Sequence, residues 1–152
     1  MADIQHTVSI KAAAAGIYSA LTTAEGIRQW WTEDVYLEEM VGGEGIFRFN
    51  YGKTVETVVR IIDLQERAHV AWEVVHSFRP EQDGTVISFS LSRHGDETIL
   101  DLNQTGYIAR DETFGLMNKG WAYYMVSLKR YLELGKGAPS PHLDFSIMDD
   151  NI

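Results

Sequence analysis

Apolar residues recur at every third or fourth position in one long stretch of the chain, which is typical of one face of an α-helix. The positions on this face are Phe114, Met117, Trp121, Tyr124, Met125, Leu128, Tyr131 and Leu132. Asp111 is a suitable N-cap, and Gly135 is suited to the position just past the helix end. The pattern therefore predicts one helix of about 22 residues, from about Asp111 to Leu134.

The other patterned segments alternate between apolar and polar residues, as strands with one buried face do. The first runs from Ile4 to Ile10. Six more are rich in β-branched and aromatic residues, and they cover residues 35–38, 45–51, 54–64, 69–78, 85–93 and 97–107. Because the segments between them are short enough for hairpins, the six predict an antiparallel meander.

Residues 12–31, between the first two strands, favour two short helices, the first suggested by Ile17, Tyr18 and Leu21. Thr22 and Glu25 have the spacing of a capping box that would start the second helix. No repeat or linker interrupts the chain, so residues 1–135 are expected to form one domain. Residues 136–152 would be either a tail or a strap packed through Leu143 and Phe145.

Strand parity places four polar side chains among apolar neighbours on the face that meets the long helix: His6, Tyr51, His76 and Gln104. A buried polar group that stays unpaired costs about 1 to 3 kcal/mol, so each needs a partner. That partner is another protein group, water or a ligand. Four such groups on one side of a sheet favour a cavity over a filled core.

Composition narrows the classes of function. The chain has 152 residues, enough for one domain with its own core, and it has no cysteine, which excludes thiolate nucleophiles, disulfides and zinc-cysteine sites. Its net charge of −9 argues against nucleic acid as a partner. The chain shows no signal sequence and no apolar run of about 18 residues, so we expect a soluble, cytoplasmic protein that does not enter a membrane.

The sequence shows no motif with established catalytic or cofactor chemistry. The five histidines lack the spacing of metal ligands, and no G-x-S-x-G turn is present for a serine nucleophile. Gly52-Lys53-Thr54 is similar to the end of a phosphate-binding loop, but no helix follows it, so it is expected to be a hairpin turn. We therefore predict no metal, no cofactor and no assigned catalytic residue.

The order of one strand, two short helices, six strands and one long helix resembles the helix-grip fold of the START-like, or SRPBCC, superfamily. Within it, the sequence A-L-T followed by Trp30-Trp31, and Gly120-Trp121 in the last helix, resemble the activator of heat-shock-protein ATPase homologue-like branch. The resemblance covers about residues 4–134. It implies an α+β fold whose seven-stranded antiparallel sheet wraps around the last helix. That branch often carries a histidine where this chain has Gln104, so no role for that histidine carries over.

Our leading hypothesis, implied by this resemblance, is that a small hydrophobic or aromatic molecule binds between the sheet and the long helix. The deepest space is expected between Trp121 and the positions of Trp72, Phe89 and Gln104. The predicted binding residues are Trp30, Phe49, Tyr51, Trp72, His76, Phe89, Leu102, Gln104, Met117, Trp121 and Met125.

Two alternatives stay open. One is an enzyme of the polyketide cyclase or aromatase kind on the same fold, with His76 or Tyr51 as general acid or base. The other is a co-chaperone-like module that acts on a protein partner through its surface. Fold resemblance alone does not decide between these classes, because one scaffold hosts many functions.

Overall fold

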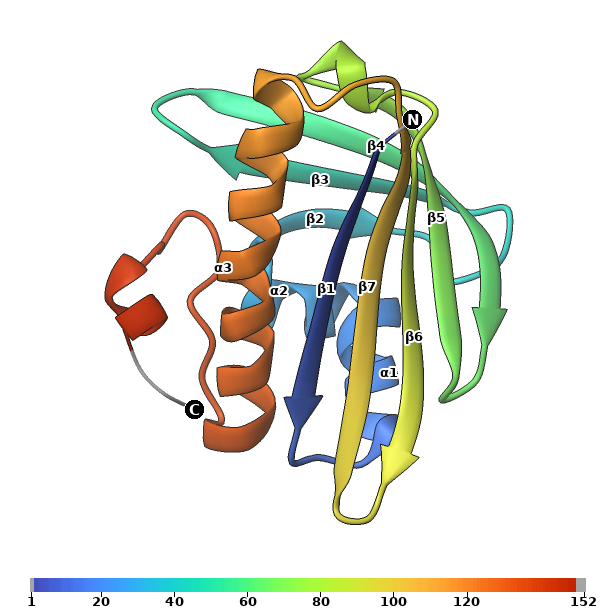
Figure 1. Ribbon diagram of the computed structural model, residues 1–152, viewed down its shortest axis with the longest axis vertical. Helices are drawn as coiled ribbons and strands as arrows, with labels where there is room; N and C mark the ends of the chain where they lie inside the picture. The colour runs from blue at the N-terminus through green and yellow to red at the C-terminus, as the bar shows by residue number, and fades with distance from the viewer. Residues whose placement is uncertain (1, 150–152) are drawn as a thin grey trace.

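The computed structural model describes residues 2–149, which form one sheet, one long helix and several short helices (Figure 1). The strands are β1 (Ala2–Ile10), β2 (Asp34–Leu37), β3 (Glu44–Asn50), β4 (Thr54–Gln65), β5 (His69–Ser77), β6 (Val86–His94) and β7 (Glu97–Tyr107). The α-helices are α1 (Ala14–Thr22), α2 (Ala24–Trp30) and α3 (Glu112–Leu134), and the 3-10 helices are η1 (Pro80–Gln82) and η2 (Phe145–Asp149).

The sheet is an antiparallel meander with one addition. Its strand order is β1-β7-β6-β5-β4-β3-β2, so each strand from β2 to β7 pairs with its neighbour in sequence and β1 adds to β7. In Figure 1 the strands β1, β7, β6 and β5 stand to one side of α3, while β4, β3 and β2 pass behind it. The sheet therefore curves around the helix, which confirms the predicted α+β helix-grip fold.

The long helix begins and ends where its sequence signals predict. The Asp111 carboxylate accepts a hydrogen bond of 2.9 Å from the Phe114 N–H, as an N-cap does. Gly135 adopts a φ of 86° in the left-handed region, where a side chain would be strained. The helix is continuous over its 23 residues, and its apolar face lies toward the sheet.

The cap of α2 lies one residue later than predicted. Thr22 is still helical, and its hydroxyl donates to the Tyr18 carbonyl at 2.7 Å. Thr23 is the N-cap, and its Oγ1 accepts from the Gly26 N–H at 3.0 Å. The Thr22/Glu25 capping box is therefore wrong, because α1 extends one residue further than its apolar pattern indicates.

A bulge in β5 changes the face of one predicted site residue. Val59 pairs with Val74 and Val58 pairs with His76, so Val75 is an extra residue without a partner opposite it. The strand parity is inverted beyond this point, and His76 is exposed on the outer face while Ser77 is buried. The prediction that His76 faces the helix is therefore wrong.

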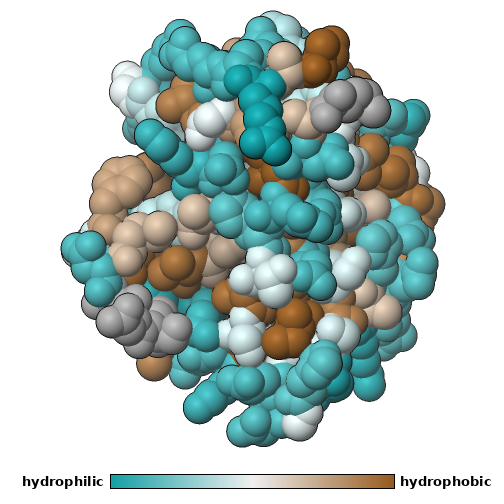
Figure 2. All heavy atoms as spheres, viewed as in Figure 1, coloured by the Kyte–Doolittle hydropathy of each residue, from teal (hydrophilic) through white to brown (hydrophobic). Residues whose placement is uncertain are grey.

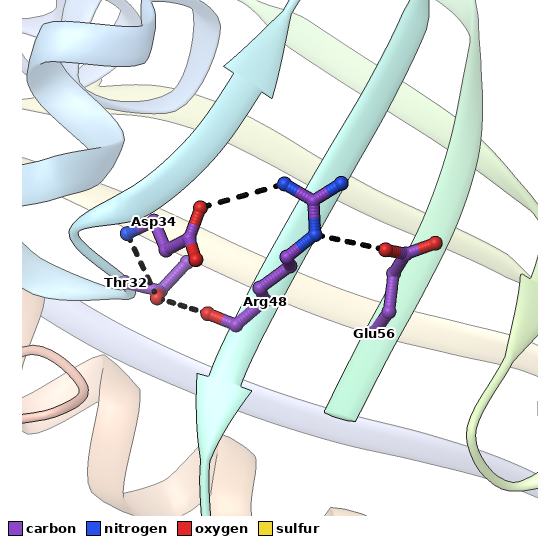
Figure 3. A network of polar contacts seen from close by, with 4 residues as sticks. All are labelled: Thr32, Asp34, Arg48 and Glu56. Atoms are coloured by element: carbon purple, nitrogen blue, oxygen red, sulfur yellow. Dashed lines mark hydrogen bonds and ion pairs between the residues drawn. The ribbon is translucent and has the colours of Figure 1, made fainter. Parts of the chain in front are cut away.

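The outer face of the sheet carries a polar network at the start of β2 (Figure 3). Arg48 forms ion pairs with Glu56 at 2.9 Å and Asp34 at 3.6 Å. The Thr32 hydroxyl donates to the Arg48 carbonyl at 2.5 Å and accepts from the Asp34 N–H at 3.3 Å. Exposed ion pairs add little stability, but the buried Thr32 fixes the course of the chain directly after Trp31.

Residues 136–149 run back along α3. The Ser140 N–H donates to the Trp31 carbonyl, and the Ser140 carbonyl accepts from the Glu33 N–H, both at 2.9 Å. The Tyr123 hydroxyl donates to the Ala138 carbonyl at 2.6 Å. Ile147 is buried, Leu143 is half-buried and Phe145 is 68% exposed. The segment thus closes one side of the space between α3 and β3.

No helix within residues 2–149 is long and apolar enough to cross a membrane.

Candidate ligand-binding cavity

A cavity of about 620 Å³ lies between the β3–β4 end of the sheet, the first half of α3 and the C-terminal segment. Phe49, Val55, Thr57 and Ile87 contribute its sheet side. Met117, Gly120, Trp121 and Tyr124 contribute its helix side. Leu143 and Phe145 close it from the segment after α3. Figure 2 shows tan and brown atoms gathered over η2 and the segment before it, so apolar surface continues outside the cavity.

The floor of the cavity is an aromatic cluster centred on Trp31. Its ring stacks on Trp72 with centroids 5.7 Å apart and on Trp121 with centroids 5.2 Å apart. Phe89 contacts Trp72 and Trp121 edge-on, with centroids 5.2 Å and 6.0 Å away. These rings fill the space in which the sequence predicted the deepest part of the cavity. That prediction is wrong, because Trp31 enters from α2 and the open volume lies on its other side, toward Tyr51.

Gln104 is fully engaged by the protein. Its Oε1 accepts from the Trp121 indole N–H at 2.9 Å. Its Nε2 donates to Thr85 Oγ1 at 2.9 Å and to Gln82 Oε1 at 3.1 Å, and Gln82 Oε1 also accepts from the Tyr107 hydroxyl. This network holds the Trp121 ring in place at the end of the cavity. Gln104 therefore orients a wall residue but does not itself line the cavity.

Two tyrosine hydroxyls form the polar part of the wall. Tyr51 Oη and Tyr124 Oη are 2.9 Å apart, and the Tyr51 ring stacks on Phe49 with centroids 5.6 Å apart. Burial is the main reason that the pKa of each phenol is raised, and the contact with Tyr51 raises the pKa of Tyr124 further. Both hydroxyls are therefore neutral near pH 7. They are suited to hydrogen bonding with a ligand, but neither is suited to act as a base.

Thr57 supplies a second polar group deep in the wall. It is only 6% exposed and faces the cavity from β4. Among residues 2–149 its hydroxyl has no hydrogen-bond partner. A buried hydroxyl usually finds a partner, so this group is suited to a ligand or to water.

The predicted residues fall into three groups. Phe49, Tyr51, Met117 and Trp121 line the cavity. The core residues that do not line it are Trp30, Trp72, Phe89, Leu102, Gln104 and Met125. Trp30 is fully buried, with its indole N–H donating to the Ala20 carbonyl at 2.8 Å. His76 lies on the opposite face of the sheet, and His6 pairs instead with Asn118 Oδ1 at 2.9 Å near the sheet edge.

Several wall residues are not among the predicted binding residues. Tyr124 was on the apolar face of the helix and Thr57 had inward parity, so the signal for both was present. Trp31 follows the last residue of α2, where helical periodicity no longer tells which way a side chain points. Gly120 leaves open space beside the helix, since a Cβ at this position would meet no heavy atom within 4 Å.

Within residues 2–149 no group of three or more His, Asp or Glu side chains is arranged to hold a metal ion. The chemistry of the cavity is that of apolar and aromatic contact with a few hydroxyl groups. Such walls, with a small number of polar groups that fix orientation, are typical of small-molecule sites.

Comparison with known proteins agrees with this architecture. The family model described as activator of Hsp90 ATPase homolog 1-like protein matches residues 11–133. The chain is 33% identical to the protein in the solution structure of the Aha1 dimer from Colwellia psychrerythraea. That match covers 90% of this chain and 100% of the other, with a TM-score of 0.81. Comparison with curated proteins gives no match.

More distant solved structures share the fold. SSP2350 from Staphylococcus saprophyticus is 18% identical over 90% of this chain and 95% of its own, with a TM-score of 0.74. CalU16 from Micromonospora echinospora is 16% identical over 97% of this chain and 80% of its own, with a TM-score of 0.71. Since the family match spans most of the sheet and all but the last residue of α3, the chain belongs to the activator of Hsp90 ATPase homolog 1-like family.

Proposed function

We propose that this protein binds a small apolar or aromatic molecule in the cavity between the sheet and α3. The observation that carries the proposal is a space of about 620 Å³ walled by aromatic side chains. Ligand sites typically measure about 300 to 1,000 Å³ and have predominantly apolar walls.

The nature of the wall supports an aromatic or flexible apolar ligand. Trp31 and Trp121 offer ring faces for stacking, which stabilises offset or edge-on aromatic pairs. Met117 is unbranched and repacks at little cost, so it can adapt to ligands of different outline. Thr57 and the Tyr51/Tyr124 pair supply hydroxyl groups that can fix orientation. The cytoplasmic location predicted from the sequence remains part of this proposal.

The test is native mass spectrometry of freshly purified protein, followed by titration with the neutral apolar probe N-phenyl-1-naphthylamine. A bound apolar molecule should appear as a fixed mass increment that denaturation removes. The probe should give saturable enhancement of its own emission and quench the emission of Trp31 and Trp121, which both line the cavity. Absence of a co-purified mass, together with a linear and unsaturated probe response, would overturn the proposal.

The enzyme alternative now rests on the hydrogen bond between the hydroxyls of Tyr51 and Tyr124. His76 is on the outer face, so Tyr51 is the remaining candidate, with Tyr124 as its hydrogen-bonded neighbour. With a raised pKa, the pair would act as a donor to a ligand carbonyl. If the co-purified molecule is converted on incubation and Tyr51→Phe leaves it unchanged while still binding it, the protein is an enzyme.

A protein partner is the third candidate. The related structure described as the Aha1 dimer from Colwellia psychrerythraea supports a test of self-association for this chain. Phe145 and Met148 are 68% and 43% exposed on the C-terminal segment and would suit a partner surface. Sedimentation velocity over a range of concentrations separates the outcomes, since a dimer should dissociate on dilution. A monomer at every concentration would argue against self-association.

A further inference from the structure

The mouth of the cavity carries positive charge only. Lys53, Arg79 and Lys119 line it, and no aspartate or glutamate among residues 2–149 does. The chain as a whole has 13 Lys and Arg against 22 Asp and Glu, so a random sample of its charges would be mostly acidic. We infer that the bound molecule carries an anionic group, a carboxylate or a group of similar charge, next to its apolar body. This inference rests on the proposed function.

The two lysines are placed where a ligand would leave the cavity for water. Lys53 lies in the turn between β3 and β4, Lys119 lies on α3, and both line the cavity. Both side chains are exposed, as are Tyr51 and Leu116 beside them. Within residues 2–149 neither lysine forms an ion pair, so both charges remain for a ligand.

Arg79 contributes less free charge than the lysines. Its Nη1 donates to Thr113 Oγ1 at 3.3 Å, and the Thr113 hydroxyl donates to the Glu81 carboxylate at 2.6 Å. Glu81 therefore offsets part of its charge without lining the cavity. Asp144 is the acid next to the wall residues of the C-terminal segment, and it stays ionised because hydrogen bonds from the hydroxyl and the N–H of Ser146 hold its pKa below the usual value. The lining itself therefore carries two lysines without ion pairs and one partly offset arginine, with one acid beside it.

This arrangement fits a molecule with two ends. The apolar end would lie on the rings of Trp31 and Trp121, beyond the buried hydroxyl of Thr57. The anionic end would stay near water between Lys53 and Lys119, so its charge would not lose its hydration. The positive charges of Lys53 and Lys119 would attract anionic ligands over a long range. Without them, the overall net charge of −9 would repel such ligands.

Paired competitors test the inference. Decanoate and decan-1-ol form one pair, and 2-naphthoate and 2-naphthalenemethanol form the other, each displacing N-phenyl-1-naphthylamine from the wild-type protein. At low ionic strength we expect each acid to bind about 1.5- to fivefold more tightly than its alcohol, the range that one exposed ion pair gives. The preference should shrink in 0.5 M NaCl. Comparing the alkyl acid with the aromatic acid tells which kind of apolar body the cavity takes.

Charge variants locate the effect. The double variant Lys53→Gln/Lys119→Gln should lose the preference for the acids and keep the wild-type affinity for the alcohols. Lys136→Gln removes an exposed lysine that does not line this cavity, and it should keep the preference. Equal binding of acid and alcohol to the wild type would overturn the anionic ligand and leave the proposed function standing. If the probe does not bind and no molecule co-purifies, both fail.

Discussion

Filling the cavity from the helix side should separate ligand binding from folding. Gly120 lines the cavity in the interior of α3, and a Cβ built there meets no heavy atom within 4 Å. Gly115 lies on the same helix, is exposed, does not line the cavity, and its Cβ also meets nothing within 4 Å. Replacing each glycine by leucine removes one glycine from α3, in its first turn at Gly115 and in its interior at Gly120, but only Gly120→Leu puts a side chain into the cavity.

The expected magnitudes follow from helix propensity and packing. Glycine in a helix interior is about 0.8 to 1.0 kcal/mol less favourable than alanine, and leucine is close to alanine. Both variants should therefore gain roughly 0.5 to 1 kcal/mol, or a rise of about 1 to 4 °C in melting temperature for a chain of this length. A ligand that now overlaps the leucine would meet an overpacking cost of about 1 to 3 kcal/mol, which weakens binding by about 5- to 150-fold.

The assay combines thermal unfolding with titration of N-phenyl-1-naphthylamine. Gly120→Leu should melt at or above the wild-type temperature and bind the probe weakly, while Gly115→Leu should be equally stable and bind it as the wild type does. If Gly120→Leu lost several degrees of stability and Gly115→Leu did not, the space beside Gly120 would be filled in solution. Wild-type binding by a well-folded Gly120→Leu would place the probe elsewhere.

Three further predictions concern stability. Gln104→Leu leaves the Trp121 indole N–H and other buried partners without an acceptor or donor, and it should cost at least about 1 to 3 kcal/mol in urea unfolding. Because burial raises the pKa of Tyr124 above that of the unfolded chain, stability should be complete below about pH 10 and fall above it. Tyr124→Phe should make that fall shallower by up to about 1.4 kcal/mol per pH unit. Ile147→Ala should cost about 2 kcal/mol or more because Ile147 is 4% exposed, whereas Met148→Ala, at a 43% exposed neighbour, should cost little.

Each of these has a contrary outcome. An unchanged urea midpoint for Gln104→Leu would mean that water replaces the lost bonds. A stability curve of the same slope above pH 10 in wild type and Tyr124→Phe would mean that Tyr124 ionises in the folded protein as readily as in the unfolded chain. Equal effects of the Ile147 and Met148 substitutions would mean that the C-terminal segment does not stay packed on α3 in solution.

The features that the sequence predicted well are those set by local signals. The helix from 112 to 134 is confirmed because its apolar spacing, the Asp111 cap and Gly135 all act within a few residues of each other. The meander is confirmed for the same reason, since short turns join neighbouring strands. The position of the cap at Thr23 was missed by one residue because Thr22 and Thr23 offer the same hydroxyl.

The features that the sequence did not predict depend on distant contacts. One unpaired residue, Val75, moves His76 to the other face, and nothing in the alternating pattern of β5 marks that bulge. Trp31 occupies the centre of the aromatic cluster because its backbone is held by Ser140, more than a hundred residues away. The open volume is displaced toward Tyr51 as a result. Side-chain packing among rings, and not the curvature of the sheet alone, decides where the cavity lies.

The position of α3 beside β1 also bears on self-association through backbone pairing. The first strand is an outer strand of the sheet, and its outward backbone groups are an opportunity for another chain to add a strand. Lys129 Nζ donates to the Ser9 carbonyl, and the Glu133 carboxylate accepts from the Lys11 N–H at 2.7 Å. The helix thus occupies the place that a further strand would take along this side (Figure 1). The opposite side ends in β2, which is only four residues long. One edge of the sheet is thus covered by α3 and the other is formed by a short strand. The sheet therefore offers little template for amyloid-like growth, although it is rich in β-branched residues.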